Sequence, residues 1–184
     1  MVAKKSIVGQ IENRNFLAPT GFKFQLNRTP KVTYFGNAVN IPSIDLGVAQ
    51  YTNYLRDIPL PGDKIEFADL RLRFLVDENL ENYMLIHNWL KGLGYPETTQ
   101  EFKDLNTDED GLLDRGETFC DGSLHILNSN YRDVAIVKFN DLFPISLTSL
   151  DFTASDTDIN FFTAEAVFKY TVYNIVEPDG RTPL

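Results

Sequence analysis

One stretch of the chain, residues 65–94, constrains the fold more than any other. Across residues 70–76 every second residue is apolar, and Arg71 and Arg73 fall between them, which is the pattern of a strand with one buried face. Asp77 follows in a favourable N-cap position, and the carboxylates after it suit the positive end of a helix dipole. We therefore predict a strand that leads directly into a helix.

The predicted helix begins after Asp77 and is apolar around most of its circumference, with Trp89 in its second half. Gly92, Gly94 and Pro96 end it. A helix this apolar must be covered on more than one side. The remaining chain has the features of strands and loops, so we expect a mainly β (α+β) fold in which this helix plugs or flanks one sheet assembly.

Length, charge and cysteine content narrow the class of protein. The chain has 184 residues, which suits a single domain, 1–184, with a core of its own. Its one cysteine, Cys120, excludes an internal disulfide framework and favours folding in a reducing cytosol. No apolar run approaches the roughly 20 residues of a membrane-spanning helix, and no secretory signal is evident. The net charge of −9 argues against gripping nucleic acid, but it is compatible with a surface that DNA slides past.

Loops and tails connect the predicted strands. The segments expected to lack regular structure are an N-terminal arm (1–15), an extended crossing loop (48–64), an acidic loop insertion (95–123) and a polar C-terminal tail (177–184). The crossing loop contains Pro61, Gly62 and Asp63, a strong turn signal.

The longest predicted strand covers residues 161–175. Strict alternation separates Phe162 from the residues of the opposite face, which include Val167, Lys169 and Tyr173. About 14 residues at ~3.3 Å each would span roughly 45 Å, well beyond an ordinary strand. Such a strand projects past its own sheet or runs along a partner. We therefore predict that these four side chains contribute to an assembly interface.

Two interpretations remain for Arg71 and Arg73, which project from one face of a strand in an acidic protein. They are either solvated surface charges or partners for carboxylates of a neighbouring copy, because strand alternation is compatible with both. On the second interpretation they belong to the same predicted assembly interface.

One local motif matches the spacing of a calcium-binding EF-hand loop. Asn106, Asp108 and Asp110 supply oxygen ligands at loop positions 1, 3 and 5, Gly111 allows the bend, and Glu117 stands at position 12. Residues 97–105 could form the entering helix, but the segment after Glu117 is a poor exiting helix, which favours a solvated acidic turn over a paired EF-hand. Calcium is accordingly the single cofactor that the sequence suggests, and a monomeric calcium-binding module remains an alternative function.

Side chains for catalysis are sparse. His87 lies within the predicted helix and is expected to pack in the core or an interface, because it sits between apolar residues. His125 has no metal-ligating residue at a suitable spacing, and Cys120 has no evident activating base. No phosphate-binding glycine loop or nucleophile elbow is present. We predict no catalytic residues and no enzymatic activity.

The order of several short motifs resembles the tube proteins of contractile phage tails, including the tube-initiator subunits of the baseplate. The resemblance covers most of the chain. Its elements are the opening 15–19 and strand 21–26, the strand exit 39–44, the turn 61–63, the strand 67–76, the acidic helix start 77–79 with Trp89, and the C-terminal hairpin 143–152 and 162–175.

This resemblance implies two packed antiparallel sheets that form a barrel-like sandwich with one flanking helix. It also implies hexameric rings that stack into a hollow tube, contacts with sheath and baseplate proteins, and passage of DNA through the lumen without specific binding. The protein would then reside in the virion tail after synthesis in the host cytoplasm. The candidate assembly interfaces of such a subunit are the loop 48–64, the strand 162–175 and the N-terminal arm. A baseplate tube initiator or terminal ring is the alternative role, because the insertion 95–123 and the tail 177–184 exceed the simplest tube subunit.

Overall fold

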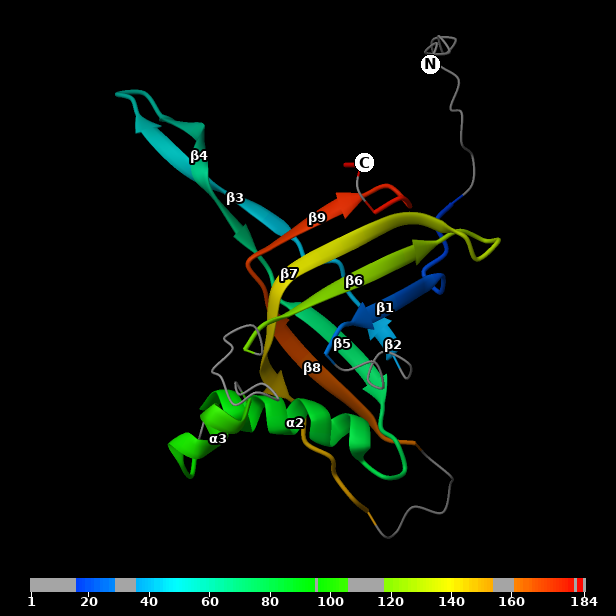
Figure 1. The fold of residues 1–184 in the computed structure, drawn as a ribbon. Coiled ribbons are helices and arrows are strands. Elements are labelled where there is room, and N and C mark those ends of the chain that lie inside the picture. Colours follow the sequence, from blue (N-terminus) through cyan, green and yellow to red (C-terminus); the bar gives the residue numbers. More distant parts are fainter. Residues whose placement is uncertain are drawn as a thin grey trace.

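The computed structural model describes residues 16–28, 36–94, 96–105, 118–153, 161–180 and 182–183. Two helices and nine strands are assigned there, and Figure 1 shows them as one layered body with a hairpin projecting from it. The elements are β1 (Phe22–Leu26), β2 (Gly36–Val39), β3 (Ile44–Thr52), β4 (Asp57–Phe67), β5 (Leu70–Leu75), α2 (Glu81–Gly94), α3 (Thr99–Leu105), β6 (Cys120–Leu127), β7 (Asp133–Leu147), β8 (Thr163–Lys169) and β9 (Val172–Val176).

The body is a sandwich whose two layers share one long strand. The strand order is β1-β6-β7-β8-β5-β2, and β9 pairs with the first half of β7. The ladders within this sheet are all antiparallel. Strand β7 bends from one layer into the other, and a register shift between Pro144 and Ser146 lies in its second half. The predicted mainly β fold with two packed sheets is confirmed, although the sheet does not close into a barrel.

The core lies between the inner faces of the two layers and α2. Its fully buried large side chains come from β5, α2, β7 and β8 and include Phe74, Trp89, Phe139 and Phe168. The Trp89 ring lies 6.2 Å from that of Phe168, and its indole N–H donates to the Thr118 carbonyl oxygen at 3.3 Å. The period-two pattern predicted for residues 70–76 is confirmed, because Leu70, Leu72 and Phe74 are buried and the arginines between them are exposed.

Helix α2 begins later than predicted and is covered on fewer sides. Residues 77–80 form a turn closed by the Leu80 N–H and the Asp77 carbonyl oxygen, and Leu80 has a φ of 59°, so the helix starts at Glu81. The side chain of Asn82, buried beneath this turn, accepts from the Asp77 N–H and donates to the Leu75 carbonyl. The opposite face leaves Met84 and Leu85 exposed, so the expectation of cover on more than one side is wrong for the single chain.

The predicted crossing loop 48–64 is also wrong, because these residues form most of the hairpin β3–β4. Pro61, Gly62 and Asp63 lie within strand β4 and make no turn there. Only glycine fits at position 62, because a Cβ there would clash with the Gly47 carbonyl oxygen of the paired strand β3.

The single long strand predicted for residues 161–175 is interrupted. The structure has β8 and β9 with a break at Tyr170 and Thr171, and the Thr171 N–H donates to the Asn140 carbonyl instead of continuing the β8 ladder. Strand β8 pairs with β5 and β7, whereas β9 pairs with β7 in the other layer. The longest strand in the described part of the chain is β7, which continues through Pro144.

Other predicted segments are only partly described. The N-terminal segment 1–15 and the motif 106–117 lie outside the described residues. Within 95–123, helix α3 agrees with the possible entering helix 97–105, and the prediction of a loop is wrong for α3 and for the start of β6. None of the helices in the described ranges has the length and apolar character to cross a membrane.

Candidate functional site: an assembly surface

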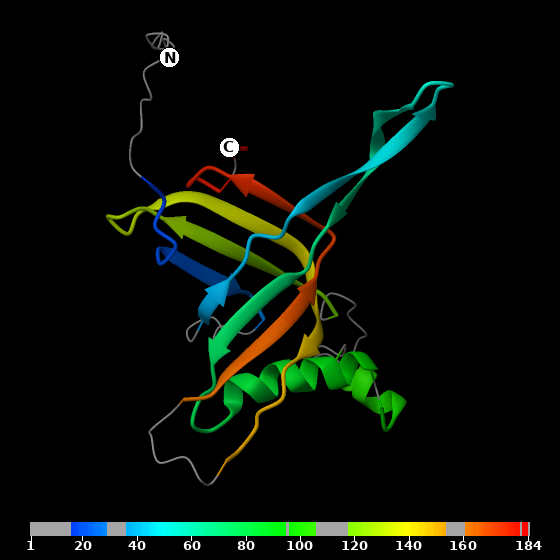
Figure 2. The same cartoon turned by 180° about the vertical axis from the view of Figure 1, so that it is seen from behind.

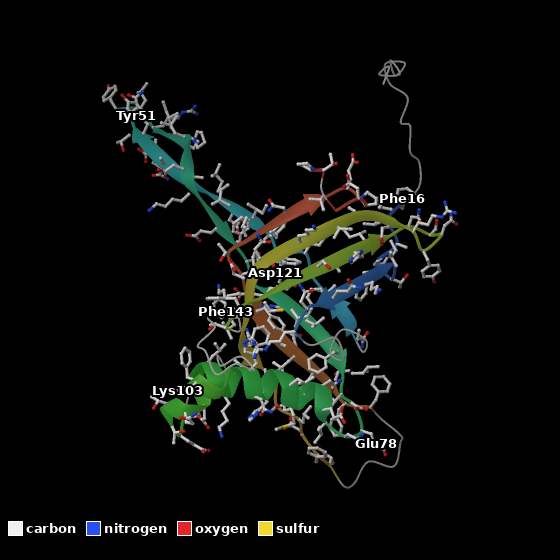
Figure 3. All side chains as sticks on the ribbon, viewed as in Figure 1. Phe16, Tyr51, Glu78, Lys103, Asp121 and Phe143 are labelled. Atoms are coloured by element: carbon white, nitrogen blue, oxygen red, sulfur yellow. The ribbon has the colours of Figure 1, made fainter. Side chains whose placement is uncertain are left out.

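The hairpin β3–β4, residues 44–67, projects from the sandwich and is the most unusual surface of the molecule (Figure 1 and Figure 2). Every residue of β3 is exposed. Tyr51 lies far from the body in Figure 3, and the tip residues Tyr54 and Leu55 are 96% and 81% exposed. The other large apolar side chains exposed on the hairpin are Ile44, Leu46, Val48, Leu60 and Ile65.

The exposed apolar side chains of this hairpin are not typical of a surface that stays in contact with solvent. A two-stranded hairpin without a packed face is marginal by itself. Contiguous exposed apolar surface on a soluble protein marks an interaction site. The described part of the chain places no element over the far half of the hairpin. Its side chains therefore fit a surface that a partner covers.

The two edges of the hairpin differ in hydrogen-bonding capacity. At the turn, the Asn53 N–H donates to the Arg56 carbonyl. In an antiparallel ladder every second pair is hydrogen-bonded, so the next hydrogen-bonded pairs away from the turn are Tyr51 with Ile58 and Ala49 with Leu60. Pro59 and Pro61 fall at the intervening positions, where the backbone nitrogen faces away from β3. The outer edge of β4 therefore lacks two donors, as in edges that natural proteins protect. Strand β3 contains no proline and keeps its outward donors, including that of Gln50.

The body also offers free strand edges. Among the described strands, β1, β2 and β9 each pair on one side only. The end of β9 is partly covered, because Val176 forms a bridge with Pro183 of the folded-back tail. Unpaired N–H and C=O groups on such edges are templates for strands of another chain.

The predicted interface residues Arg71 and Arg73 lie on the outer face of β5, beside the edge strand β2. Arg73 forms an ion pair of 3.1 Å with Glu165 of its own chain, directly across the ladder. Arg71 and Arg73 line a groove of about 230 Å³ together with Glu165 and residues of β2. The interpretation of both arginines as partners for another copy stays a prediction, although Arg73 already has a carboxylate.

The other four predicted interface residues occupy different environments, and the structure does not bring them together. Val167 lies in β8 and faces neighbours in both β5 and β7, and Lys169 forms an ion pair with Asp69 at 2.6 Å. Tyr173 is buried within the chain, and the ring of Phe162, just before β8, lies 4.8 Å from the tilted ring of Phe152. Their part in assembly stays a prediction, but the reason given for it, a single strand too long for its own sheet, is wrong.

The predicted calcium ligands Asn106, Asp108, Asp110 and Glu117 lie outside the described residues, so the structure leaves that prediction untested. No group of three metal-ligating side chains is present within the described ranges.

His87 is exposed on α2, so the expectation that it packs in the core of this chain is wrong. His125 contacts Ser123 (3.3 Å) and Asp133 (3.4 Å). Ser123 and His125 are two residues apart in β6 and therefore project from the same face of that strand. Cys120 is buried, and burial raises the pKa of its thiol, so the thiolate nucleophile is disfavoured.

The segment 48–64 was predicted as part of an assembly interface, but its hairpin structure was not predicted from the sequence pattern. A signal was present, because residues 44–52 and 57–67 mix apolar and β-favouring residues around the turn residues Asn53–Arg56. The prolines outweighed it, since proline inside a strand ordinarily argues against that assignment.

Comparison with known proteins agrees with this architecture. No protein-family profile matches the sequence, and no curated protein sequence matches it. A chain of the anti-feeding prophage cap that terminates the tube aligns with a TM-score of 0.58 and 13% identity, over 91% of this chain and 95% of that one. A chain of the anti-feeding prophage baseplate gives 0.57 and 13%, over 85% and 91%. A chain of the PVC sheath–tube complex of an extracellular contractile injection system gives 0.56 and 16%, over 94% and 99%.

At these identities the likeness defines the fold. The chain has the tail-tube-like fold found in tube and baseplate assemblies of contractile injection systems. The family resemblance seen in the order of the sequence motifs is thereby confirmed at the level of the fold.

Proposed function

We propose that this protein is a non-catalytic structural subunit of a contractile tail, in which six copies close a ring and the rings stack into a tube. The observation that carries the proposal is the projecting hairpin, whose apolar side chains and β3 edge are left without cover within the described chain. The fold supports the same role, because its likeness is to chains of tube, cap and baseplate assemblies.

The outer edge of β3 would pair with a free strand edge of a second copy. Main-chain hydrogen bonds then supply affinity, and alternate side chains such as Val48 supply apolar burial. Pro59 and Pro61 remove donors from the outer edge of β4, so this edge cannot pair in the same way and only the β3 edge of the hairpin is available. A head-to-tail contact between unlike surfaces closes a ring when its rotation permits, which removes the exposed edges.

The test is Gln50→Pro, which removes an outward donor of β3 without removing a ladder bond to β4. We expect the subunit to stay folded by circular dichroism, and rings or tubes in negative-stain images to disappear. The matched control is Pro59→Ala, which restores a donor on the β4 edge and should leave assembly intact. Normal rings from Gln50→Pro would contradict pairing through β3, and a single small particle for the wild type at high concentration would contradict the whole proposal.

The surroundings of the tube are also proposed. The partners would be further copies of this chain, sheath subunits and baseplate proteins, and the location would be the tail of an extracellular particle assembled after synthesis in the host cytoplasm. A net charge of −9 suits a lumen that DNA passes without binding, because anionic walls repel phosphate. Absence of DNA retention by assembled tubes at low salt would support this part, and retention would contradict it.

The position of the ring along the tube has a second candidate. The likeness to baseplate, sheath–tube and cap chains is nearly equal, with TM-scores of 0.57, 0.56 and 0.58. A tube initiator or terminal ring would form single rings that do not polymerise, whereas a tube subunit would form long stacks. Copy number per particle separates the two roles.

A calcium-binding loop is the remaining candidate from a different class. Helix α3 ends at Leu105, directly before the predicted ligand Asn106, as an entering helix does in an EF-hand. Calorimetry with calcium on the wild type and Glu117→Ala tests it. Heat that disappears in the variant supports the loop, and absence of heat at millimolar calcium removes it.

A further inference from the structure

The two ends of the projecting hairpin meet where it joins the sandwich. Ile44 and Phe67 are paired as the last rung of the β3–β4 ladder. Just beyond that rung, the Ala68 N–H donates to the Ser43 carbonyl oxygen at 3.1 Å. Any change in the direction of the hairpin must therefore act through this narrow base.

Two tyrosine hydroxyls from the body hold the base, one on each chain segment. The Tyr173 hydroxyl donates to the Pro42 carbonyl oxygen at 3.0 Å, before β3 begins. The Tyr170 hydroxyl donates to the Ala68 carbonyl oxygen at 2.9 Å, after β4 ends. One hydrogen bond to each of the two chain segments resists both tilt and twist of the hairpin relative to the body.

The rings of these tyrosines enclose a side chain of the hairpin itself. Phe67 lies 6.0 Å from the Tyr170 ring and 5.5 Å from the Tyr173 ring. Phe139 of β7 contacts the same two tyrosines from the body side, at 5.3 Å and 5.7 Å. Tilted and edge-to-face contacts of this kind are directional, so the four rings define one orientation.

The break between β8 and β9 creates this arrangement. Residues 170 and 173 are three apart, so an uninterrupted strand would place them on opposite faces. Because the chain leaves the β8 ladder at Tyr170 and Thr171, both tyrosines face the same cluster, with their ring centroids 5.9 Å apart. The break therefore brings together the side chains of Tyr170 and Tyr173, which a continuous strand would place on opposite faces.

We infer that Tyr170 and Tyr173 form a clamp, defined by these two residues, that fixes the direction of the projecting hairpin relative to the sandwich. Its purpose rests on the proposed function, because a hairpin held at one angle presents the β3 edge to a neighbouring copy without a loss of freedom on docking. The ion pair between Lys169 and Asp69 lies beside the clamp and restrains the same base. Burial raises the pKa of Tyr170 to about 12, which extends to higher pH the range over which its hydroxyl can donate.

The experiment removes both hydroxyls and keeps the rings, in Tyr170→Phe/Tyr173→Phe. Amide hydrogen exchange is followed at Ala68, whose N–H closes the base, and at Val137 in the body, at a dilution that gives one particle size for all variants. We expect exchange at Ala68 to become about fivefold faster for each hydroxyl lost, because a typical net hydrogen bond corresponds to that factor. Exchange at Val137 should be unchanged. The matched control is Tyr83→Phe, which removes a hydroxyl bond to the Thr148 carbonyl far from the base.

The outcomes separate the clamp from the proposed function. Faster exchange confined to the hairpin base establishes the clamp. Unchanged exchange at Ala68, or an equal increase at Val137, overturns it, whatever happens to assembly. If the base loosens and rings still form normally, the clamp stands and the docking role of the hairpin fails. If the base loosens and ring formation weakens, whereas Tyr83→Phe assembles normally, both stand.

Discussion

The sandwich body and the projecting hairpin are built from similar residues but differ in how far their apolar side chains are buried. In the body, alternate side chains of β5 and β8 are fully buried against the opposite layer and α2. In the hairpin, Val48, Tyr51 and Leu60 point into solvent. The same β-favouring composition is thus satisfied within the chain in one region and left for a second chain in the other.

This difference teaches where stability and assembly reside. The body contains the burial that holds one subunit folded, since buried apolar area is the main favourable term in folding. The hairpin contributes little to that term and is held in place through its base. Substitutions in the two regions should therefore affect different measurements, and each prediction below tests that separation.

The largest expected effect is in the core. Phe74→Ala removes a fully buried ring between β5 and its neighbours and should lower the free energy of unfolding by about 3–5 kcal/mol in urea denaturation. Tyr54→Ala, at the exposed hairpin tip, should change it by less than about 0.5 kcal/mol. Equal losses from the two variants would show that the hairpin belongs to the folding unit.

Proline substitution sharpens the same comparison. Val167→Pro places proline in a strand paired on both sides, so a ladder position is disturbed and the subunit should lose about 3 kcal/mol or more. Gln50→Pro in the hairpin should leave thermal unfolding of the subunit nearly unchanged. A stable, folded Val167→Pro that merely fails to assemble would contradict the pairing of β8 within the chain.

A moderate effect is expected where the strand β5 meets α2. Asn82→Ala leaves the Asp77 N–H and the Leu75 carbonyl without their side-chain partner, which costs about 1–3 kcal/mol in a buried site. Asn88→Ala on the exposed face of the same helix is the control and should be nearly neutral. Comparable urea midpoints for the two variants would argue that the turn before α2 needs no internal support.

The smallest effect concerns α3, which is attached to α2 through Lys91. This ammonium contacts Glu101 at 2.8 Å and Glu97 at 3.2 Å. The hydrogen bond from Lys91 lowers the carboxyl pKa of Glu101, and the bonds to Glu101 and Glu97 raise the pKa of Lys91. Lys91→Met should speed amide exchange in α3 only slightly, because ion pairs at a protein surface contribute little to stability.

The pH dependence of this attachment follows from the two directions. A lowered carboxyl pKa gives stabilisation that is present above about pH 4.5 and lost as the pH falls through the lowered value. A raised ammonium pKa gives stabilisation that is present below about pH 10.5 and lost as the pH rises further. Protection of the α3 amides, corrected for intrinsic rates, should therefore be constant between about pH 5 and pH 10. A change near neutral pH would implicate another group.

Much of the fold was predictable because its signals are local. The alternation of residues 70–76 and the periodic apolar pattern around Trp89 gave β5 and α2 in the correct order. The start of α2 was misplaced, since Asp77 has the chemistry of an N-cap while the backbone of Leu80 and the side chain of Asn82 set the start three residues later, at Glu81. The segment 48–64 was predicted as an interface, but its strands were missed, because the prolines of β4 have opposite meanings at a paired edge and at a free one.

The sequence by itself determined the mainly β class, the helix that covers the core, and the order of elements that resembles the tail-tube family. Periods of two and of about 3.6 residues decide these properties, and they are visible in one dimension. Only the tertiary structure decided that residues 44–67 stand away from the body and that the predicted long strand breaks at Tyr170 and Thr171. Both depend on which backbone donors find partners from distant strands, and no local pattern records that.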